Sequence, residues 1–150
     1  NERWENFFML KEGHLKFRGK HLETYFFTGQ DRFWLNEPLL AMVSQDVIKD
    51  DERFNENCIW HGNSISLLGA ARFDVPKDPM QTWRIRTTDG AVELELIPQG
   101  LRHEHLNLGL ARSVYNQPYG LYSGILVDSG GKRHTVEKAF GIAEDHVATW

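Results

Sequence analysis

A hairpin signal near the middle of the chain constrains the fold more than any other feature. Asp89-Gly90 is a dipeptide that supplies the positive φ angles of a two-residue turn, and it lies between the alternating segments Trp83–Thr88 and Ala91–Ile97. The resulting register separates ion pairs on one face from apolar pairs on the other: Arg86 opposite Glu93, Arg84 opposite Glu95, Ile85 opposite Leu94 and Trp83 opposite Leu96. The pattern therefore predicts antiparallel β-structure with Trp83 in the core.

Two further dipeptides, Gly62-Asn63 and Gly130-Gly131, indicate two more hairpins. The strands expected beside them are Cys58–His61 with Ser64–Asp74, and Gly120–Asp128 with Arg133–Phe140. A separate strand is expected at Arg102–Leu110, after a turn marked by Pro98 and Gly100. This succession of short strands favours an all-β domain.

The first third of the chain is less regular. His14–Gly19 and Glu23–Thr28 are rich in aromatic residues and are expected to form another pair of strands. In the segment Asn36–Asp50, Asn36 could cap a helix that Pro38 opens. Propensity by itself favours a helix there, so this segment keeps two interpretations.

Composition limits the function classes. The chain has 150 residues, 41% of them hydrophobic, and a net charge of -4, so it fits one domain and lacks the basic balance of a nucleic-acid binder. Its single cysteine, Cys58, cannot form an internal disulfide, and no apolar run is long enough to span a membrane. A cytoplasmic location follows as the expectation. Because no P-loop, dinucleotide fingerprint or nucleophile elbow is present, we expect no cofactor.

From Glu56 onward the chain resembles an uncharacterised family, labelled only as a domain of unknown function, which is itself similar to the lipocalin-like carotenoid hydratases. The resemblance rests on motifs that occur in order over much of the chain: Glu56-Asn57-Cys58-Ile59-Trp60, Leu68-Gly69, Arg72-Phe73-Asp74, Asp78-Pro79-Met80, Trp83-Arg84-Ile85-Arg86 with Asp89-Gly90, Leu106-Asn107-Leu108-Gly109-Leu110, Gln117-Pro118-Tyr119-Gly120 with Ser123-Gly124, and Gly141-Ile142-Ala143-Glu144-Asp145-His146 ending in Trp150.

This resemblance implies an antiparallel, calycin-like architecture. The fold class predicted is all-β, as a lipocalin-like barrel or a barrel-like sandwich with at most one short helix. The family would also make Leu39–Ile48 a strand, and we favour that interpretation over the helix because a barrel needs every edge paired. Residues 1–150 are expected to form a single β domain in which 1–40 match no pattern and 56–150 form the family-like core. Relatives would be longer at the N-terminal side, so the chain could be the C-terminal part of a two-barrel protein.

Three adjacent residues near the C-terminus, Glu144, Asp145 and His146, are the candidates for acid–base catalysis. In a regular strand, Asp145 and His146 would point to opposite faces, whereas a turn or bulge could bring them together. The alternative is structural, with the acids capping backbone N–H groups and His146 bonded locally.

His103-Glu104-His105 places two imidazoles on one side of a strand, at a spacing that a metal site can use. No third ligand follows nearby in the sequence. A solvated strand face is the preferred interpretation, and no metal site is predicted.

Four polar and aromatic residues, Asn107, Tyr115, Gln117 and Tyr119, are candidates for a ligand-facing lining, with Trp60 and Trp83 as apolar wall. Amides and tyrosine hydroxyls orient a small molecule without the cost of a buried charge. The competing interpretation makes Gln117-Pro118-Tyr119-Gly120 a corner that closes one end of the barrel.

Three functions remain open. The first is a module that binds an apolar or amphipathic small molecule inside the barrel. The second is a cofactor-independent hydratase or isomerase acting on an isoprenoid or lipid, in which Asp145 or Glu144 protonates an alkene and His146 assists. The third is a structural domain that packs on a missing N-terminal barrel. The oligomeric state and the identity of the ligand are not determined by the sequence.

Overall fold

The computed structural model describes residues 18–28, 39–45, 50–107, 109 and 112–149, and nine β-strands lie in these ranges. No helix occurs in these ranges, and hence none that could cross a membrane. The strands are β1 (Arg18–Thr28), β2 (Leu39–Gln45), β3 (Cys58–His61), β4 (Ser64–Leu67), β5 (Ala71–Asp74), β6 (Trp83–Thr87), β7 (Val92–Asn107), β8 (Arg112–Val127) and β9 (Arg133–Thr149). The all-β prediction is confirmed.

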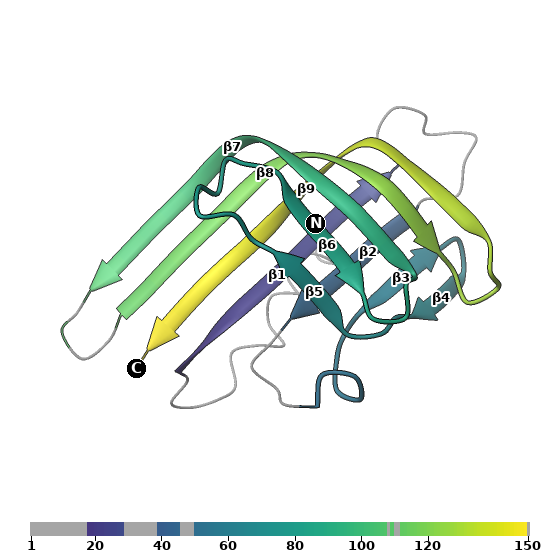
Figure 1. The fold of residues 1–150 in the computed structure, drawn as a ribbon, viewed down its shortest axis with the longest axis horizontal. Helices are drawn as coiled ribbons and strands as arrows, with labels where there is room; N and C mark the ends of the chain where they lie inside the picture. The colour runs from purple at the N-terminus through teal and green to yellow at the C-terminus, as the bar shows by residue number, and fades with distance from the viewer. Residues whose placement is uncertain (1–17, 29–38, 46–49, 108, 110–111, 150) are drawn as a thin grey trace.

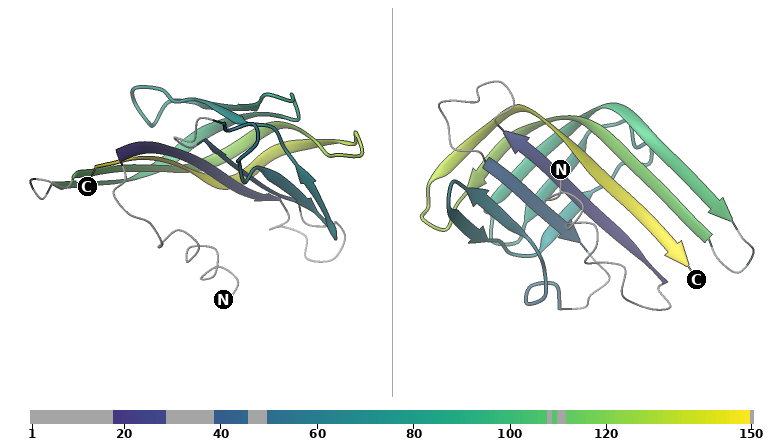
Figure 2. Two further views of the ribbon diagram at one scale, coloured as in Figure 1. Left: turned by 90° about the horizontal axis from the view of Figure 1, so that it is seen from below. Right: turned by 180° about the vertical axis from the view of Figure 1, so that it is seen from behind.

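A single antiparallel sheet carries all nine strands in the order β4-β3-β2-β1-β9-β8-β7-β6-β5. The sheet bends sharply, so that the β5–β6 end lies over β1 and β2 as a second layer (Figures 1 and 2). The layers meet where the backbone N–H of Phe73 in β5 donates to Gln45 Oε1 in β2 at 3.2 Å. Since β4 and β5 remain unpaired as edges among the described strands, the sheet does not close into a barrel and is a barrel-like sandwich.

The core fills the space between the two layers. Alternate residues of the strands supply it, because successive side chains of a strand point to opposite faces. Trp83 is its largest member, and its indole N–H donates to the carbonyl of Pro79 at 3.0 Å. Other large apolar side chains that are less than 2% exposed are Val43, Ile59, Ile85, Val92, Leu94, Leu96, Tyr122, Leu126 and Val136. The predicted core positions Trp83, Leu94 and Leu96 are confirmed.

The predicted register of the central hairpin is also confirmed. Trp83 pairs with Leu96, Ile85 with Leu94, and the two arginines with the two glutamates as the alternation required. The turn is held by the Asp89 carboxylate, which accepts hydrogen bonds from the hydroxyl of Thr87 at 2.6 Å, the N–H of Gly69 at 2.6 Å and the N–H of Ala91 at 3.0 Å. Asp89 therefore ties the hairpin to the segment before β5.

The strands expected around the other two turns need two corrections. β8 begins at Arg112 and β9 ends at Thr149, so both extend beyond the expected bounds Gly120–Asp128 and Arg133–Phe140, and Gln117–Gly120 lies within β8 instead of forming a corner. Cys58–His61 and Ser64–Leu67 form the predicted hairpin, and Val127 pairs with Arg133 across the second turn. However, Ser64–Asp74 is not one strand. Gly69 lies between β4 and β5, and the chain crosses there from one end of the sheet to the other. The alternation of polar and apolar residues does not reveal this crossing, because the segments before and after Gly69 both alternate.

The expected turn at Pro98 and Gly100 is wrong. β7 continues through both residues from Val92 to Asn107, and a β-bulge between Pro98 and Gly100 takes up the irregularity. A bulge uses the same turn-prone residues while the ladder continues on either side. The long strand β7 therefore keeps its pairing with β8 well beyond the sandwich.

In the first third of the chain, β1 is one strand that includes both Gly19 and Glu23, so the predicted break between two strands there is wrong. Residues 14–17 lie outside the described residues. The strand interpretation of the next segment is confirmed by β2, and the helix interpretation is contradicted over Leu39–Gln45. Residues 36–38 and 46–48 lie outside the described residues.

Two glycines differ in how strongly the structure requires them. Gly124 lies at a bulge between β8 and β9 with φ +145°, and an added Cβ would lie 2.1 Å from the carbonyl oxygen of Glu93. Gly131 has φ +79° in the turn before β9, with no atom within 4 Å of an added Cβ. Both need a left-handed backbone, but only Gly124 also needs the space.

Substituting Gly124→Ala is expected to lower the free energy of unfolding by roughly 2 to 4 kcal/mol, because the methyl group displaces the neighbouring strand β7 in addition to straining φ. Gly131→Ala is the matched control and is expected to cost about 1 to 2 kcal/mol from φ alone. Urea unfolding of both variants measures the difference. If both variants lose the same free energy of unfolding, the close approach of the Glu93 carbonyl to Gly124 does not contribute to the cost of the substitution.

Asp89→Asn tests the carboxylate at the hairpin turn. Burial raises the pKa of Asp89, but the hydrogen bonds from Thr87, Ala91 and Gly69 outweigh it and leave the pKa below its usual value. The wild type is therefore expected to lose stability as the pH falls below about 4 through that lowered pKa, and the variant is expected to lose less over the same interval. At pH 7 the variant should be about 1 to 2 kcal/mol less stable.

The control for this prediction is Glu95→Gln, which removes an exposed ion pair with Arg84. Exposed pairs contribute about 0 to 1 kcal/mol, so its stability should change little at either pH. Urea unfolding at pH 7 and pH 3.5 distinguishes the two variants. If Glu95→Gln loses as much stability as Asp89→Asn, the carboxylate at the turn has no special role.

Candidate functional site

The predicted site residues converge on the outer face of the long strands, which is the face opposite the core. Beyond the sandwich, β7, β8 and β9 continue side by side as a bent ribbon (Figure 1). Paired residues share a face, and the register pairs Glu104 with Tyr115, Tyr115 with His146, and Arg102 with Gln117. Glu144 precedes His146 by two residues on β9 and lies on the same side.

Three of these side chains form one hydrogen-bonded network. The Tyr115 hydroxyl donates to Glu144 Oε1 at 2.7 Å. The Gln117 side-chain amide donates to the Tyr115 hydroxyl oxygen at 2.6 Å and to the same Glu144 oxygen at 2.7 Å. Glu144 is only 9% exposed although it lies away from the core. The network therefore holds a mostly buried carboxylate with neutral donors, which we call the Glu144 network.

Electrostatics keep Tyr115 protonated. Burial raises the pKa of its phenol, and the hydrogen bond to Glu144 and repulsion by that carboxylate raise it further. Arg102, whose guanidinium carbon lies 5.9 Å from the centre of the tyrosine ring, and the hydrogen bond from Gln117 lower this pKa without outweighing the other causes. Arg102 itself is bound to Glu104, with Nε 2.9 Å from Oε1. Tyr115 is therefore a fixed hydrogen-bond donor across the neutral pH range.

His146 lies beside the network. Its Nε2 is 2.9 Å from Ser113 Oγ, and its ring meets the Tyr115 ring edge-on with centroids 5.6 Å apart. Asp145 pairs with Asn116 on the opposite face of the ribbon. Because this segment is a regular strand and not a turn, Asp145 and His146 point to opposite faces and do not form a dyad.

An apolar patch adjoins the Glu144 network along the same face. It consists of Ile97, Tyr119 and Phe140, which are 57%, 41% and 47% exposed. The rings of Tyr119 and Phe140 have centroids 6.3 Å apart. Ile97 and Phe140 both pair with Leu121, so the patch crosses three strands. The outer face thus joins exposed apolar surface to a recessed polar group.

Other predicted lining residues do not join this face. Asn107 pairs with Arg112 and falls on the opposite side of the ribbon from Tyr115. Trp60 is on β3, which β2, β1 and β9 separate from β8. Trp83 is fully buried in the packed core and cannot line an open interior. The expectation of a ligand enclosed within the sheet is therefore not supported by these residues.

The two histidines of β7, His103 and His105, are exposed. His103 Nδ1 lies 2.7 Å from Asn116 Oδ1 on the side of the ribbon away from the Glu144 network. His105 pairs with Val114 on that same side. The preferred interpretation of a solvated strand face fits these positions. Leu108 and Leu110, which were expected to extend the strand, lie outside the described residues.

Sequence reasoning missed two groups. Arg102 and Ser113 belong to the outer face, and the β7–β8 register would have found them if the bulge in β7 had been recognised. The second group is a cluster of His61, Asp128 and His134, the described side chains that could hold a metal ion. His61 lies far from Asp128 and His134 in the sequence, so the three residues form no spacing motif.

A shallow hollow of about 320 Å³ lies elsewhere, over the ion-paired face of β5, β6 and β7. Its walls include Arg84 and Arg86 with Glu93 and Glu95. Asp74 also lines the hollow, so three carboxylates face two guanidinium groups, and Arg84 is paired with Glu95. The hollow therefore carries a small excess of negative charge.

Comparison with known proteins identifies one sequence family. Residues 38–150 match a family described as Domain of unknown function (DUF2804). No curated protein and no solved structure matches the chain. The match begins before the motif region that starts at Glu56 and includes β2.

Replacing Glu144 by Gln is expected to lower the pKa of Tyr115 toward its ordinary value near 10, because the variant removes both the charged acceptor and its repulsion of the phenolate. The ¹³Cζ signal of Tyr115 followed through an alkaline titration measures this change. Glu137→Gln, at an exposed position of β9, is the control and should leave the titration unchanged. If the pKa of Tyr115 stays equally high in Glu144→Gln, the carboxylate of Glu144 does not influence the ionisation of Tyr115.

Proposed function

Because the chain belongs to the DUF2804 family, whose description assigns no activity, its role has to be argued from the site, and we propose that the outer face of the β7–β9 ribbon binds an amphipathic small molecule. The apolar part of the ligand lies on the patch of Ile97, Tyr119 and Phe140. Its polar group reaches the Glu144 network. This places the binding function on the surface of the sheet and not inside a barrel.

The observation that carries the proposal is the mostly buried carboxylate of Glu144 beside exposed apolar side chains. Burying a charge is costly unless hydrogen bonds replace water, and here Tyr115 and Gln117 supply them to a single oxygen, Oε1. Among the side chains that the structure describes, none donates to Oε2. That oxygen is an acceptor suited to a donor on a ligand.

The charges of the face indicate what the polar group should be. Arg102 is bound to Glu104, so the positive charge nearest the network is already paired. A carboxylate at this position disfavours an anionic head group such as a carboxylate or phosphate. A hydroxyl that donates to Glu144 fits, and a long isoprenoid or fatty alcohol combines such a group with an apolar chain. The resemblance to lipocalin-like proteins, which stays a prediction, agrees with this ligand class.

A second candidate function is acid–base chemistry on the same ligand. One observation favours it: Glu144 and His146 share this face, and the Ser113 hydroxyl lies within hydrogen-bond distance of His146. A carboxylate and an imidazole beside a bound alcohol are the groups that a hydratase or isomerase would use. Asp145 takes no part in this candidate because it faces the other side. Turnover of a bound alcohol in the wild type and not in His146→Asn would distinguish catalysis from binding.

Binding can be tested with farnesol, farnesyl acetate and farnesene, which share a chain and differ in the head group. Isothermal titration is expected to show tighter binding of the alcohol, because only farnesol can donate a hydrogen bond to Glu144. Loss of one such bond to a charged acceptor corresponds to about tenfold or more in affinity. Glu144→Gln should remove most of the preference for farnesol, while Phe140→Ser should weaken all three compounds.

Phe54→Ser is the matched control, since Phe54 is 56% exposed and lies outside the ribbon. It should leave every affinity unchanged. Equal binding of alcohol and hydrocarbon would contradict the assignment of the head group to Glu144. Absence of measurable binding for all three compounds, or binding that Phe140→Ser does not weaken, would overturn the proposed site.

A further inference from the structure

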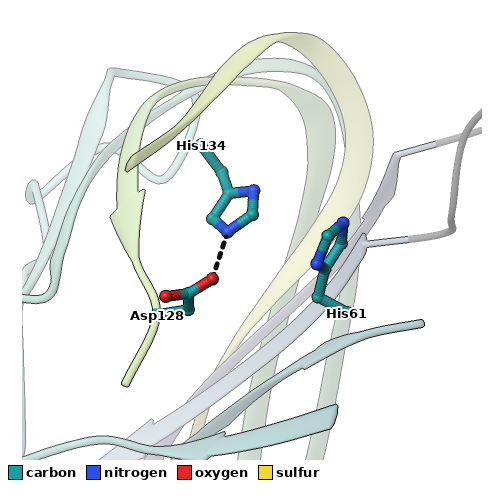
Figure 3. Close-up of side chains that lie close together, drawn as sticks. All are labelled: His61, Asp128 and His134. Carbon is teal, nitrogen blue, oxygen red and sulfur yellow. Dashed lines mark hydrogen bonds and ion pairs between the residues drawn. The ribbon is translucent and has the colours of Figure 1, made fainter. Parts of the chain in front are cut away.

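Three potential metal ligands meet at the end of the sandwich remote from the Glu144 network. His61 is the last residue of β3, Asp128 follows β8, and His134 is the second residue of β9. Figure 3 shows the two imidazole rings and the carboxylate facing a common space. One ligand atom of each residue lies within 4.8 Å of the others.

The bend of the sheet brings these residues together, because β3 is separated from β9 by β2 and β1. A hydrogen bond beside the cluster also joins β4 to the turn between β8 and β9. The hydroxyl oxygen of Ser66 on β4 accepts it from the N–H of Ser129 at 3.0 Å. The His61 and His134 rings lie with centroids 4.7 Å apart. The cluster therefore joins the β3–β4 hairpin to the turn between β8 and β9.

The carboxylate is oriented for coordination. Asp128 Oδ1 accepts hydrogen bonds from the N–H groups of Gly130 at 2.9 Å and Lys132 at 3.0 Å. Oδ2 points instead to His134 Nε2, at 2.8 Å. Backbone donors thus fix one oxygen and direct the other toward the imidazoles, which is the arrangement that outer hydrogen bonds give to metal-binding carboxylates.

Burial favours a site as well. The side chains of His134 and Asp128 are 9% and 17% exposed, so water competes little for them. Ligands bonded to zinc at about 2.0 to 2.2 Å lie roughly 3 to 4 Å from each other. Asp128 Oδ2 and His134 Nε2, hydrogen-bonded at 2.8 Å, are slightly closer than this, and a ligand atom of His61 lies within 4.8 Å of both. Binding of an ion would therefore draw His61 inward and separate the other two atoms slightly.

From this geometry we propose that His61, Asp128 and His134 form a binding site for a divalent transition-metal ion of the zinc class. Two imidazoles with one carboxylate suit Zn²⁺, Co²⁺, Ni²⁺ or Fe²⁺, whereas Mg²⁺ and Ca²⁺ prefer oxygen ligands alone. Three protein ligands leave a fourth position for water or a small ligand. Coordination through His134 Nε2 requires that nitrogen to be unprotonated, so a proton that it carries toward Asp128 is released to solvent or moves to Nδ1 when the ion binds. The bound ion links the two hairpins.

The test uses the whole chain without a histidine tag, with Co²⁺ as spectroscopic probe and Zn²⁺ as competitor. We expect one Co²⁺ per chain, with visible absorption bands that Zn²⁺ abolishes. His134→Ala should weaken Co²⁺ binding at least tenfold. The matched control is the double variant His103→Ala with His105→Ala, which removes the exposed pair on β7 and should leave the affinity unchanged.

Adventitious binding has a distinct signature: affinity lost in the β7 double variant and retained in His134→Ala would overturn the proposal. Binding that neither variant changes would overturn it too. Should His134→Ala fail to fold, the wild type still decides the matter through the ¹⁵N signals of its histidine rings. Zn²⁺ must shift those of His61 and His134 and spare His103 and His105, and the opposite pattern excludes the site.

Discussion

The two-residue period of the long strands decides where the candidate functional groups of this protein can lie. One face of β7, β8 and β9 is buried against the folded-over end of the sheet, with Leu96 and Tyr122 in the core. Alternation then directs the intervening residues to the outer face. Beyond the sandwich the strands keep that phase, so Tyr115 and His146 remain on the outer side while Asp145 takes the other. The Glu144 network therefore depends on this alternation of side chains between the two faces as well as on its own hydrogen bonds.

Bending of the sheet is the second constraint, because it creates contacts between strands that are not neighbours in the ladder. The bond from Phe73 to Gln45 joins β5 to β2, and the bond from Ser129 to Ser66 joins the β8–β9 turn to β4. Both are polar contacts at the margin of the core. The cluster of His61, Asp128 and His134 lies beside the second of these contacts. A flatter sheet with the same hydrogen-bonded pairs would keep the hairpins and lose the cluster.

Two carboxylates show how similar chemistry serves different ends. Asp89 is held mostly by donors of its own turn and of the segment before β5, and it stabilises the path of the backbone there. Glu144 is held by side chains of the neighbouring strand, Tyr115 and Gln117. Backbone donors suit a structural carboxylate because the main chain needs the acceptor. The side-chain donors Tyr115 and Gln117 do not need Glu144 as an acceptor, because water could satisfy them on the surface. Their convergence on one carboxylate therefore favours a binding role for Glu144.

Local patterns determined the all-β class, the three glycine-containing turns, the register of the central hairpin and the burial of Trp83, since alternation and turn chemistry act within a few residues. They did not determine where several of the strands begin and end. They also placed Tyr115, Gln117 and Glu144 among the candidates by residue type. The crossing at Gly69, the bulge at Pro98 and the side on which Asn107 falls were decided only in the folded sheet, because each depends on a partner strand that local sequence does not specify. The meeting of His61 with Asp128 and His134 has the same origin: only the curvature of the assembled sheet brings distant strands into contact.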